Sequence, residues 1–256
     1  MAESEGEGNM SNQPYPIVLI TGAARRIGAA IATFLHARQY NIIMHFHHST
    51  NAARQLAQRL NDLRPDSVSL VCADLTASED LSIIEQHVAQ QGCLHGLIHN
   101  ASLFYPTPVA EASVTQWDEL FACNVKAPFF LSKLLAPYLA DSLGCIVNIT
   151  DIHGEKPLKD YPIYSMTKAA LLMQTQSLAR ELAPKIRVNA VSPGPTLWPE
   201  EAGNMLNEQQ RQMLIERTVL KRLGHPDNIA QAVWHCLSND YLTGQVITVD
   251  GGRSLR

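Results

Sequence analysis

Asp151, Tyr164 and Lys168 are the residues whose types and spacing best suit proton chemistry. Tyr164 and Lys168 are four residues apart, and on a helix such a pair lies on one face, one turn apart. A lysine ammonium there favours the ionised phenol and lowers its pKa, so we expect Tyr164 to be a proton donor near neutral pH. Asp151 lies thirteen residues before Tyr164 and adds a carboxylate to the set.

Short apolar runs alternate with amphipathic stretches and would position these side chains. The sequence predicts strands at 17–21, 41–45, 67–73, 96–99, 145–150, 187–191 and 245–249, and helices at about 26–38, 51–63, 79–91, 115–140, 162–183 and 226–237. Strands separated by helices imply a doubly wound, Rossmann-type α/β fold, with a parallel sheet of about seven strands and helices on both faces. No repeat or low-complexity linker divides the chain, so we expect one domain over residues 15–256.

The composition is ordinary for a soluble globular protein, with 46% hydrophobic and 17% charged residues. The net charge of −4 gives no reason to expect nucleic acid or a membrane surface as a partner, and no apolar stretch is long enough to span a bilayer. Five cysteines, never spaced C-x-x-C, indicate reduced thiols, and we expect no metal site. Residues 1–14 lack the features of a signal peptide and are expected to form a disordered tail, in which Met10 is a second possible start.

The segment from Thr21 to Gly28 follows the first predicted strand and opens the first helix. Small residues there allow backbone N–H groups to approach a pyrophosphate at the helix N-terminus. Two arginines face the positive end of the helix dipole, which is unfavourable unless an anion binds nearby, although both side chains could instead extend into water. We therefore expect a dinucleotide to contact Gly22, Arg25, Arg26, Ile27 and Gly28.

The end of the second predicted strand favours NADPH over NADH. An NAD enzyme usually has Asp or Glu about 20 residues after the glycines to bind the ribose 2′-hydroxyl, whereas this strand ends in His45-Phe46-His47-His48-Ser49. His47, His48 and Ser49 could form a 2′-phosphate pocket with Arg26, the alternative being histidines on a polar surface. Since histidine has a pKa of ~6.5, we expect NADPH affinity to weaken as the pH rises, and a pH-independent titration would exclude the histidines.

These motifs resemble the short-chain dehydrogenase/reductases over essentially all of residues 15–256. The resemblance implies that Tyr164 and Lys168 are catalytic, that Lys168 also binds the nicotinamide ribose, and that Asn124 completes a proton relay through water. Contacts to the cofactor are further implied for Asp74 and Leu75 after the third strand, Asn100, Ala101 and Ser102 after the fourth, Pro193 and Gly194 after the sixth, and Tyr164 and Lys168.

At the position of Asp151, members of that family usually have a serine that donates a hydrogen bond to a carbonyl oxygen. Hydride delivery to a C=O bond builds negative charge on oxygen, which an ionised Asp151 would oppose. Delivery to a C=N bond leaves a nitrogen that needs a proton, and an acid beside a carboxylate suits that reaction. The alternative is that Asp151 only caps the turn after a strand, and the spacing alone leaves the two open.

Four departures from the family pattern resemble the pteridine reductases and the short-chain dihydromonapterin/dihydrofolate reductases. They are Arg26 and Ser102 in place of glycines, Phe104 in a proline-rich segment, and Asp151. The resemblance implies that a pterin lies between Phe104 and the nicotinamide, and stacking on a rigid ring is favourable by ~0.5–1.5 kcal/mol beyond burial. Substrate contacts are thus expected from Arg26, Ser102, Phe104, Asp151, Tyr164 and Trp198, the last as part of a lid.

The sequence therefore predicts a cytoplasmic, homotetrameric, NADPH-dependent reductase of dihydropterins, namely dihydrobiopterin, dihydromonapterin or dihydrofolate. Hydride would pass to a C=N carbon, and Tyr164 would protonate the adjacent nitrogen. One alternative is a short-chain reductase of a ketone such as a 3-oxoacyl thioester. Another is a non-catalytic NADPH-binding regulator, against which the presence of Tyr164, Lys168 and Asn124 argues.

Overall fold

Seven parallel strands form one sheet in the order β3-β2-β1-β4-β5-β6-β7 in the computed structural model, which describes residues 15–196 and 207–255. The predicted tail at 1–14 and Trp198 lie outside the described residues. The strands are β1 Ile17–Ile20, β2 Asn41–Phe46, β3 Val68–Cys72, β4 Gly96–His99, β5 Cys145–Ile149, β6 Arg187–Pro193 and β7 Val246–Val249.

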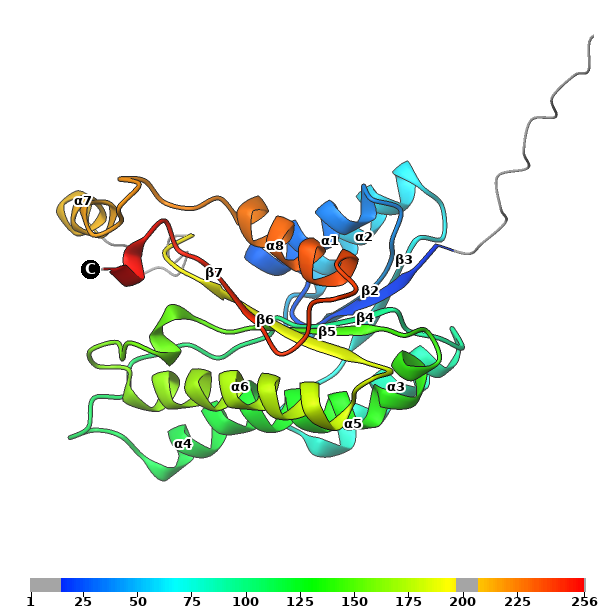
Figure 1. Ribbon diagram of the computed structural model, residues 1–256, viewed down its shortest axis with the longest axis horizontal. Coiled ribbons are helices and arrows are strands. Elements are labelled where there is room, and N and C mark those ends of the chain that lie inside the picture. Colours follow the sequence, from blue (N-terminus) through cyan, green and yellow to red (C-terminus); the bar gives the residue numbers. More distant parts are fainter. Residues whose placement is uncertain (1–14, 197–206, 256) are drawn as a thin grey trace, which may run out of the picture.

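Helices cover both faces of the sheet (Figure 1). On one face lie α1 (Arg26–His36), α2 (Thr50–Leu63) and α8 (Pro226–Ser238), and on the other lie α3 (Leu81–Ala89), α5 (Ala127–Ala140) and α6 (Pro162–Glu181). The remaining helical elements are α4 (Val114–Phe121), α7 (Glu208–Glu216) and the short turns η1 (Ser78–Asp80), η2 (Ala122–Lys126), η3 (Ile152–Gly154) and η4 (Arg253–Leu255).

Alternate strand residues enter two separate cores, one on each face of the sheet. Val18 and Ile20 of β1 pack towards α1 and α8, whereas Leu19 packs towards α3 and α5. Because side chains alternate across a strand and both faces are covered, these strands read as continuous apolar runs. The predicted doubly wound α/β fold is confirmed.

Two helical regions differ from the sequence prediction. The helix predicted over 115–140 is divided into α4, the π-helical turn η2 and α5. The helix α7 was not predicted, because it buries no residue and so lacks an apolar stripe. The capping box formed by Asn207 and Gln210 was the available signal for its start.

The strand order changes direction between β1 and β4, which are neighbours although two strands separate them in the sequence. In sheets of this kind ligands bind at the carboxyl ends of the strands at such a switch point. Thr21 and Asn100 follow the two strands there, and the Thr21 Oγ1 accepts hydrogen bonds from the backbone N–H groups of Asn100 and Ala101 at 3.0 and 3.1 Å. The topology therefore places the candidate site at this edge.

All five cysteines are free thiols, as expected, and Cys123, Cys145 and Cys236 are buried. Within the described parts of the chain, no helix has the length and apolar character needed to cross a membrane. The same residues contain no group of three or more His, Cys, Asp or Glu side chains that could hold a metal ion.

Candidate active site

A cavity of about 750 Å³ opens at the carboxyl ends of the strands. Its size is typical of a site for a cofactor and a small substrate. The turn after β1 and the end of β2 line one part of it, and η3, α6 and the end of β6 line another. The cavity therefore joins the predicted dinucleotide turn to the predicted catalytic residues.

Asp151 and Tyr164 are in direct contact within this cavity. The Tyr164 hydroxyl donates a hydrogen bond to the Asp151 Oδ2 at 2.8 Å, and the Asp151 Oδ1 accepts one from the His153 N–H at 2.8 Å. Asp151 thus caps the turn η3 and also holds the phenol. Capping the turn and contacting the proton donor are therefore compatible roles for Asp151, because each uses a different carboxylate oxygen.

Lys168 lies one turn of α6 beyond Tyr164 and is buried. Its Nζ donates a hydrogen bond to the Ile149 carbonyl at 3.0 Å and lies 5.6 Å from the centre of the Tyr164 ring. Burial lowers the pKa of Lys168 to about 8, although the charge of Asp151 acts in the opposite direction.

The expected lowering of the Tyr164 pKa is wrong. Burial raises the pKa of Tyr164 well above its ordinary value, and the charge of Asp151 and its hydrogen bond act in the same direction. The reason is that desolvation disfavours the phenolate and the nearest charged group is a carboxylate. Tyr164 is consequently a neutral phenol that releases its proton only to a strongly basic atom.

Asn124 lies in the π-helical turn η2, and its amide makes four hydrogen bonds. The Oδ1 accepts from the Leu103 N–H at 2.8 Å and the Ser102 hydroxyl at 3.2 Å, and the Nδ2 donates to the Leu103 carbonyl at 3.0 Å and the Thr167 Oγ1 at 3.1 Å. An amide side chain has no further capacity than this. Asn124 therefore ties the segment at Ser102 and Leu103 to α6, and its side chain is not part of the cavity wall.

Phe104 lies in the cavity wall beside Tyr164 of α6 and Tyr161, which precedes that helix. Its ring is stacked on Tyr161, with centroids 4.6 Å apart and an interplanar angle of 13°, and meets Tyr164 edge to face at 4.7 Å. Phe104 remains 51% exposed. A flat heteroaromatic ring can therefore extend the stack on its free surface.

The turn after β1 requires glycine at two positions. Gly22 has a φ of +62°, and a Cβ at Gly28 would lie 2.3 Å from the Gly22 carbonyl oxygen. Asn100 holds the turn from the β4 side, because its Nδ2 donates to the Thr21 and Gly22 carbonyls at 2.9 and 3.0 Å. The result is a tight turn leading into α1, the arrangement that binds a pyrophosphate.

Arg26 occupies the left-handed region, with a φ of 53°, where the family pattern has glycine. This backbone is unfavourable for a residue with a Cβ by about 1 kcal/mol. The side chain nonetheless lies in the cavity wall with Arg25, His47 and His48. The strained position is consistent with a cation that contacts an anionic ligand.

We expect Arg26→Gly to weaken NADPH binding without destabilising the fold. The variant removes a cation and also relieves the left-handed backbone, so the dissociation constant for NADPH should rise about tenfold while the melting temperature does not fall. Fluorescence titration with NADPH and NADH measures the effect. An equal loss of affinity for both cofactors would show that Arg26 does not contact the 2′-phosphate.

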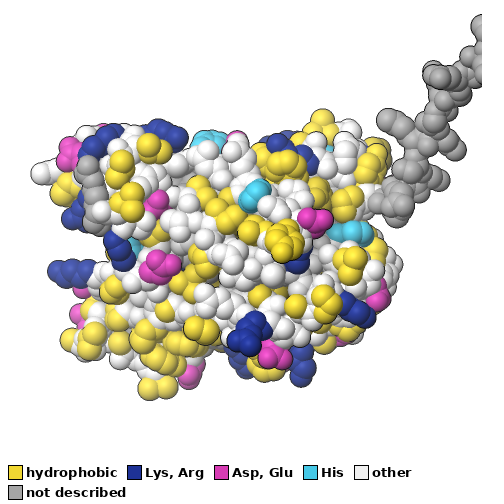
Figure 2. Space-filling model, in the orientation of Figure 1, with side chains coloured by type: hydrophobic (Ala, Val, Ile, Leu, Met, Phe, Trp, Pro, Cys, Tyr) yellow, Lys and Arg dark blue, Asp and Glu magenta, His cyan; other side chains and the backbone are white. Residues whose placement is uncertain are grey.

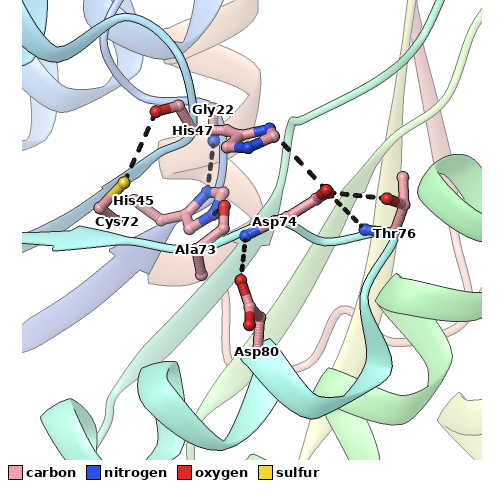
Figure 3. A network of polar contacts seen from close by, with 8 residues as sticks. All are labelled: Gly22, His45, His47, Cys72, Ala73, Asp74, Thr76 and Asp80. Carbon is pink, nitrogen blue, oxygen red and sulfur yellow. Dashed lines mark hydrogen bonds and ion pairs between the residues drawn. The ribbon is translucent and has the colours of Figure 1, made fainter.

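A polar network lies in the cavity at the carboxyl ends of β2 and β3 (Figure 3). The His47 Nδ1 lies 3.9 Å from the Asp74 Oδ1, and His47 and His48 lie with their ring centres 3.6 Å apart. Partial burial acts to raise the pKa of Asp74, but hydrogen bonds from Thr76 and the neighbouring histidines lower it overall. The histidines and Asp74 therefore meet at one edge of the cavity.

The structure brings nearly all the predicted site residues to one cavity. Its wall contains Gly22, Arg25, Arg26, Ile27, Gly28, His47, His48, Asp74, Leu75, Asn100, Ala101, Ser102, Phe104, Asp151, Tyr164, Lys168, Pro193 and Gly194. Ser49 and the side chain of Asn124 are not part of that wall. Trp198 lies outside the described residues.

Sequence reasoning missed several residues that line the cavity. Tyr161 precedes α6, and its position one helical turn before Tyr164 was the available signal. Arg217, after α7, and Arg253, in η4, belong to segments that no strand or helix pattern placed near the site. His45 lies at the end of β2 and was treated only as part of that strand.

The fold and this site define a nicotinamide-dependent reductase of the short-chain type, and comparison with known proteins agrees. The family model for enoyl-(acyl carrier protein) reductase matches residues 22–254. The chain belongs to the short-chain dehydrogenase/reductase family.

Three similar proteins act on pterins or folates according to their names. The chain is 34% identical to pteridine reductase 1 of Leishmania tarentolae, with 94% of this chain and 96% of that protein covered. It is 32% identical to the dihydromonapterin reductase of Enterobacter sp. strain 638, with coverage of 96% and 100%. A crystal structure of FolM alternative dihydrofolate reductase 1 from Brucella suis in complex with NADP has 32% identity and a TM-score of 0.84, with coverage of 94% and 96%.

The relatives also include ketone reductases. The chain is 30% identical to the 3-oxoacyl-[acyl-carrier-protein] reductase of Staphylococcus epidermidis, over 91% of this chain and 97% of that protein. The expected resemblance to pteridine reductases and dihydromonapterin reductases is nevertheless confirmed.

Proposed function

We propose that this protein reduces a dihydropterin to the tetrahydro form, with NADPH as the hydride source and Tyr164 as the proton donor. The hydrogen bond of 2.8 Å between the Tyr164 hydroxyl and the Asp151 carboxylate is the observation that carries the proposal. In a ketone reductase of this family, a hydroxyl at the position of Asp151 would donate to the developing oxyanion. A carboxylate only accepts, and its charge opposes an oxyanion.

The residues of the cavity fit NADPH. The turn at Gly22 and Gly28 leads its backbone towards the N-terminus of α1, Arg25 and Arg26 supply cations, and His47 and His48 supply ring nitrogens that can bond to phosphate oxygens. When bound, NADPH supplies a hydride. The similarity to the NADP complex from Brucella suis supports the choice of the phosphorylated cofactor.

The source of the proton follows from the protonation state of Tyr164. Its raised pKa keeps the phenol neutral, so it does not lose its proton to water near neutral pH. A nitrogen that gains negative charge after hydride addition to the neighbouring carbon is basic enough to take it. Asp151 orients the hydroxyl, and the Lys168 ammonium offsets the negative charge that remains on the tyrosine.

Asn124 has a supporting part in this proposal. Its amide is fully hydrogen-bonded, so we assign the ordering of a water that resupplies the proton to backbone carbonyls of the π-helical turn. Turns of this kind leave backbone groups outside the regular helical pattern and are frequent at functional sites.

The pH dependence of the reaction should reflect Lys168. Its pKa of about 8 means that the ammonium is present below this pH and is lost above it. We therefore expect kcat/KM for the dihydropterin to fall as the pH rises through about 8. In Lys168→Arg, whose cation persists, the remaining activity should stay constant over the same range. If kcat/KM fell with rising pH in the same way in both proteins, this role of Lys168 would be contradicted.

The first test is NADPH oxidation, followed by absorbance, with dihydrobiopterin, dihydromonapterin, dihydrofolate and an acetoacetyl thioester in parallel. The proposal expects turnover with at least one pterin and none with the thioester. Turnover with the thioester alone would favour the ketone-reductase alternative. The 30% identity to a 3-oxoacyl reductase is the reason for including this substrate. Binding of NADPH without turnover of any substrate would favour the non-catalytic regulator.

We further propose that the protein is a homotetramer. Several large apolar side chains on α4, α5 and α6 are exposed, and Figure 2 shows hydrophobic side chains gathered along the lower edge of the molecule, where α4 and α6 lie in Figure 1. The exposed apolar side chains of these three helices include Trp117, Phe129, Phe130, Met166 and Met173. Apolar patches of this kind indicate an association surface. Light scattering after size exclusion measures the mass, and a monomer would contradict the proposal.

A further inference from the structure

His45 makes three contacts beneath the dinucleotide turn. Its backbone carbonyl accepts a hydrogen bond from the Ala23 N–H at 2.9 Å, and its Nδ1 accepts one from the Gly22 N–H at 3.2 Å. Its Nε2 lies 3.1 Å from the Ala73 carbonyl, at the end of β3. Figure 3 shows the ring between Gly22 and Ala73. One residue of β2 therefore joins the turn after β1 to the end of β3.

These partners fix one form of the imidazole. A carbonyl oxygen only accepts, so the Nε2 must carry the hydrogen that faces Ala73. The Nδ1 is then the unprotonated nitrogen, as the Gly22 N–H requires. The ring is 2% exposed, and burial lowers the pKa of His45 to about 4, although the bond to Ala73 acts in the opposite direction. The charged groups near it are His47, which acts to lower the pKa, and Asp74, which acts to raise it.

The contacts to Gly22 set the direction of its peptide. Asn100 donates to the Gly22 carbonyl, and His45 accepts from the Gly22 N–H, so the residue is held on both sides. Gly22 has little freedom to move, since even a Cβ would lie 3.0 Å from the Ala101 Cα. With this peptide fixed, the chain enters α1 at the angle that presents its N-terminus to the cavity.

We propose that His45 is a positioning residue for cofactor binding, in which the unprotonated Nδ1 holds the Gly22 N–H and so keeps the turn in its pyrophosphate-binding form. The inference rests on the proposed use of NADPH, but not on the identity of the pterin. It also separates two roles within one ring. The Nδ1 serves the turn, whereas the Nε2 only joins β2 to β3.

Two substitutions divide these roles. In His45→Asn the amide oxygen can occupy the place of Nδ1 and accept from Gly22. In His45→Gln the longer amide can donate to Ala73 from the place of Nε2, but Gly22 loses its acceptor. His45→Leu removes both contacts. His36→Gln is a matched control, because it also replaces a buried histidine, which bonds to Ser67 at the other end of α1.

The measurement is the NADPH dissociation constant by fluorescence, with the melting temperature of each free protein recorded in parallel. We expect His45→Asn to bind within about twofold of the wild type, and His45→Gln and His45→Leu to bind about tenfold more weakly. His45→Asn and His45→Gln should have similarly lowered melting temperatures, and His36→Gln should keep its affinity. Equal affinities for His45→Asn and His45→Gln, or affinities that simply follow the melting temperatures, would overturn the inference.

A second measurement needs no variant. Nitrogen-15 NMR of the wild-type histidines distinguishes protonated from unprotonated ring nitrogens, and we expect an unprotonated Nδ1 for His45. A protonated Nδ1 would overturn the inference even if the variants failed to fold. A wild-type protein that does not bind NADPH would overturn the proposed function and this inference together, whereas normal wild-type binding with indifferent variants would overturn the inference alone.

Discussion

Tyr164→Phe is expected to lower the rate of dihydropterin-dependent NADPH oxidation by about 10²–10⁴-fold, because loss of a positioned proton donor typically has an effect of this size. The phenyl ring keeps its edge-to-face contact with Phe104 and its place in α6, so the fold of the site should persist. Only the hydroxyl that donates to Asp151 is removed. Steady-state kinetics gives kcat and KM for the variant.

The control for Tyr164→Phe is NADPH binding in the absence of substrate. The dissociation constant should change by less than about threefold, since the lost hydrogen bond is to Asp151 and not to the turn proposed to bind the pyrophosphate. A wild-type rate in the variant would show that Tyr164 is not the proton donor. A parallel loss of NADPH affinity would instead indicate damage to the site as a whole.

Asp151→Ser is expected to lower kcat/KM for the dihydropterin by about 10²-fold or more, because the carboxylate that orients the phenol and accepts from the substrate is lost. It should not impair any residual reduction of an acetoacetyl thioester. If the protein is a ketone reductase, the same change restores the usual serine and should increase thioester turnover instead. Asp151→Ser should therefore lower the rate of the main reaction if the protein reduces a pterin, and raise it if the protein reduces a ketone.

Asp151→Asn is the matched partner of this variant. The amide oxygen can still accept from Tyr164 or from the His153 N–H, so one of the two contacts is kept while the charge is removed. Because the charge of Asp151 contributes to the raised Tyr164 pKa, the phenol of the variant should titrate at lower pH. A spectrophotometric titration measures this shift, and an unchanged tyrosine would mean that Asp151 acts through geometry alone.

Most of the sheet was predictable because the strands other than β3 and β7 are buried on both faces. Runs such as Ile17–Ile20 and Gly96–His99 are continuous apolar segments, and their limits in the structure differ by at most a residue from the expected ones. The parallel order then brings the strand ends to one edge, so residues far apart in the sequence converge there. Most of the predicted site residues line one cavity for this reason.

Features that depend on local backbone detail were not predictable. The π-helical turn at Asn124 inserts an irregular segment without interrupting the apolar pattern from 115 to 140. The helix α7 has no buried residue and therefore no periodic signal. The left-handed backbone at Arg26 could be suspected only from the glycine that the family pattern has there.

The direction of the Tyr164 pKa shift could not be derived from the spacing of residues in the sequence. The i, i+4 relation places Lys168 one turn away, but the Nζ bonds to the Ile149 carbonyl, while Asp151 contacts the hydroxyl directly. Near-complete burial, followed by the charge and the hydrogen bond of Asp151, raises the pKa of Tyr164 despite a cation 5.6 Å from the ring. The sequence contains the three residues but not their distances.

The four hydrogen bonds of the Asn124 amide also determine which wall of the cavity can adapt. They join the backbone of Leu103 and the Ser102 hydroxyl to Thr167 of α6, so the segment that carries Phe104 cannot shift without disturbing the helix that carries Tyr164. The opposite wall includes Arg217, next to the helix α7 that buries no side chain. For the proposed reaction, tolerance of substrates with different side chains should therefore reside in the wall that contains Arg217, while the wall that contains Phe104 keeps the reacting ring in a constant position.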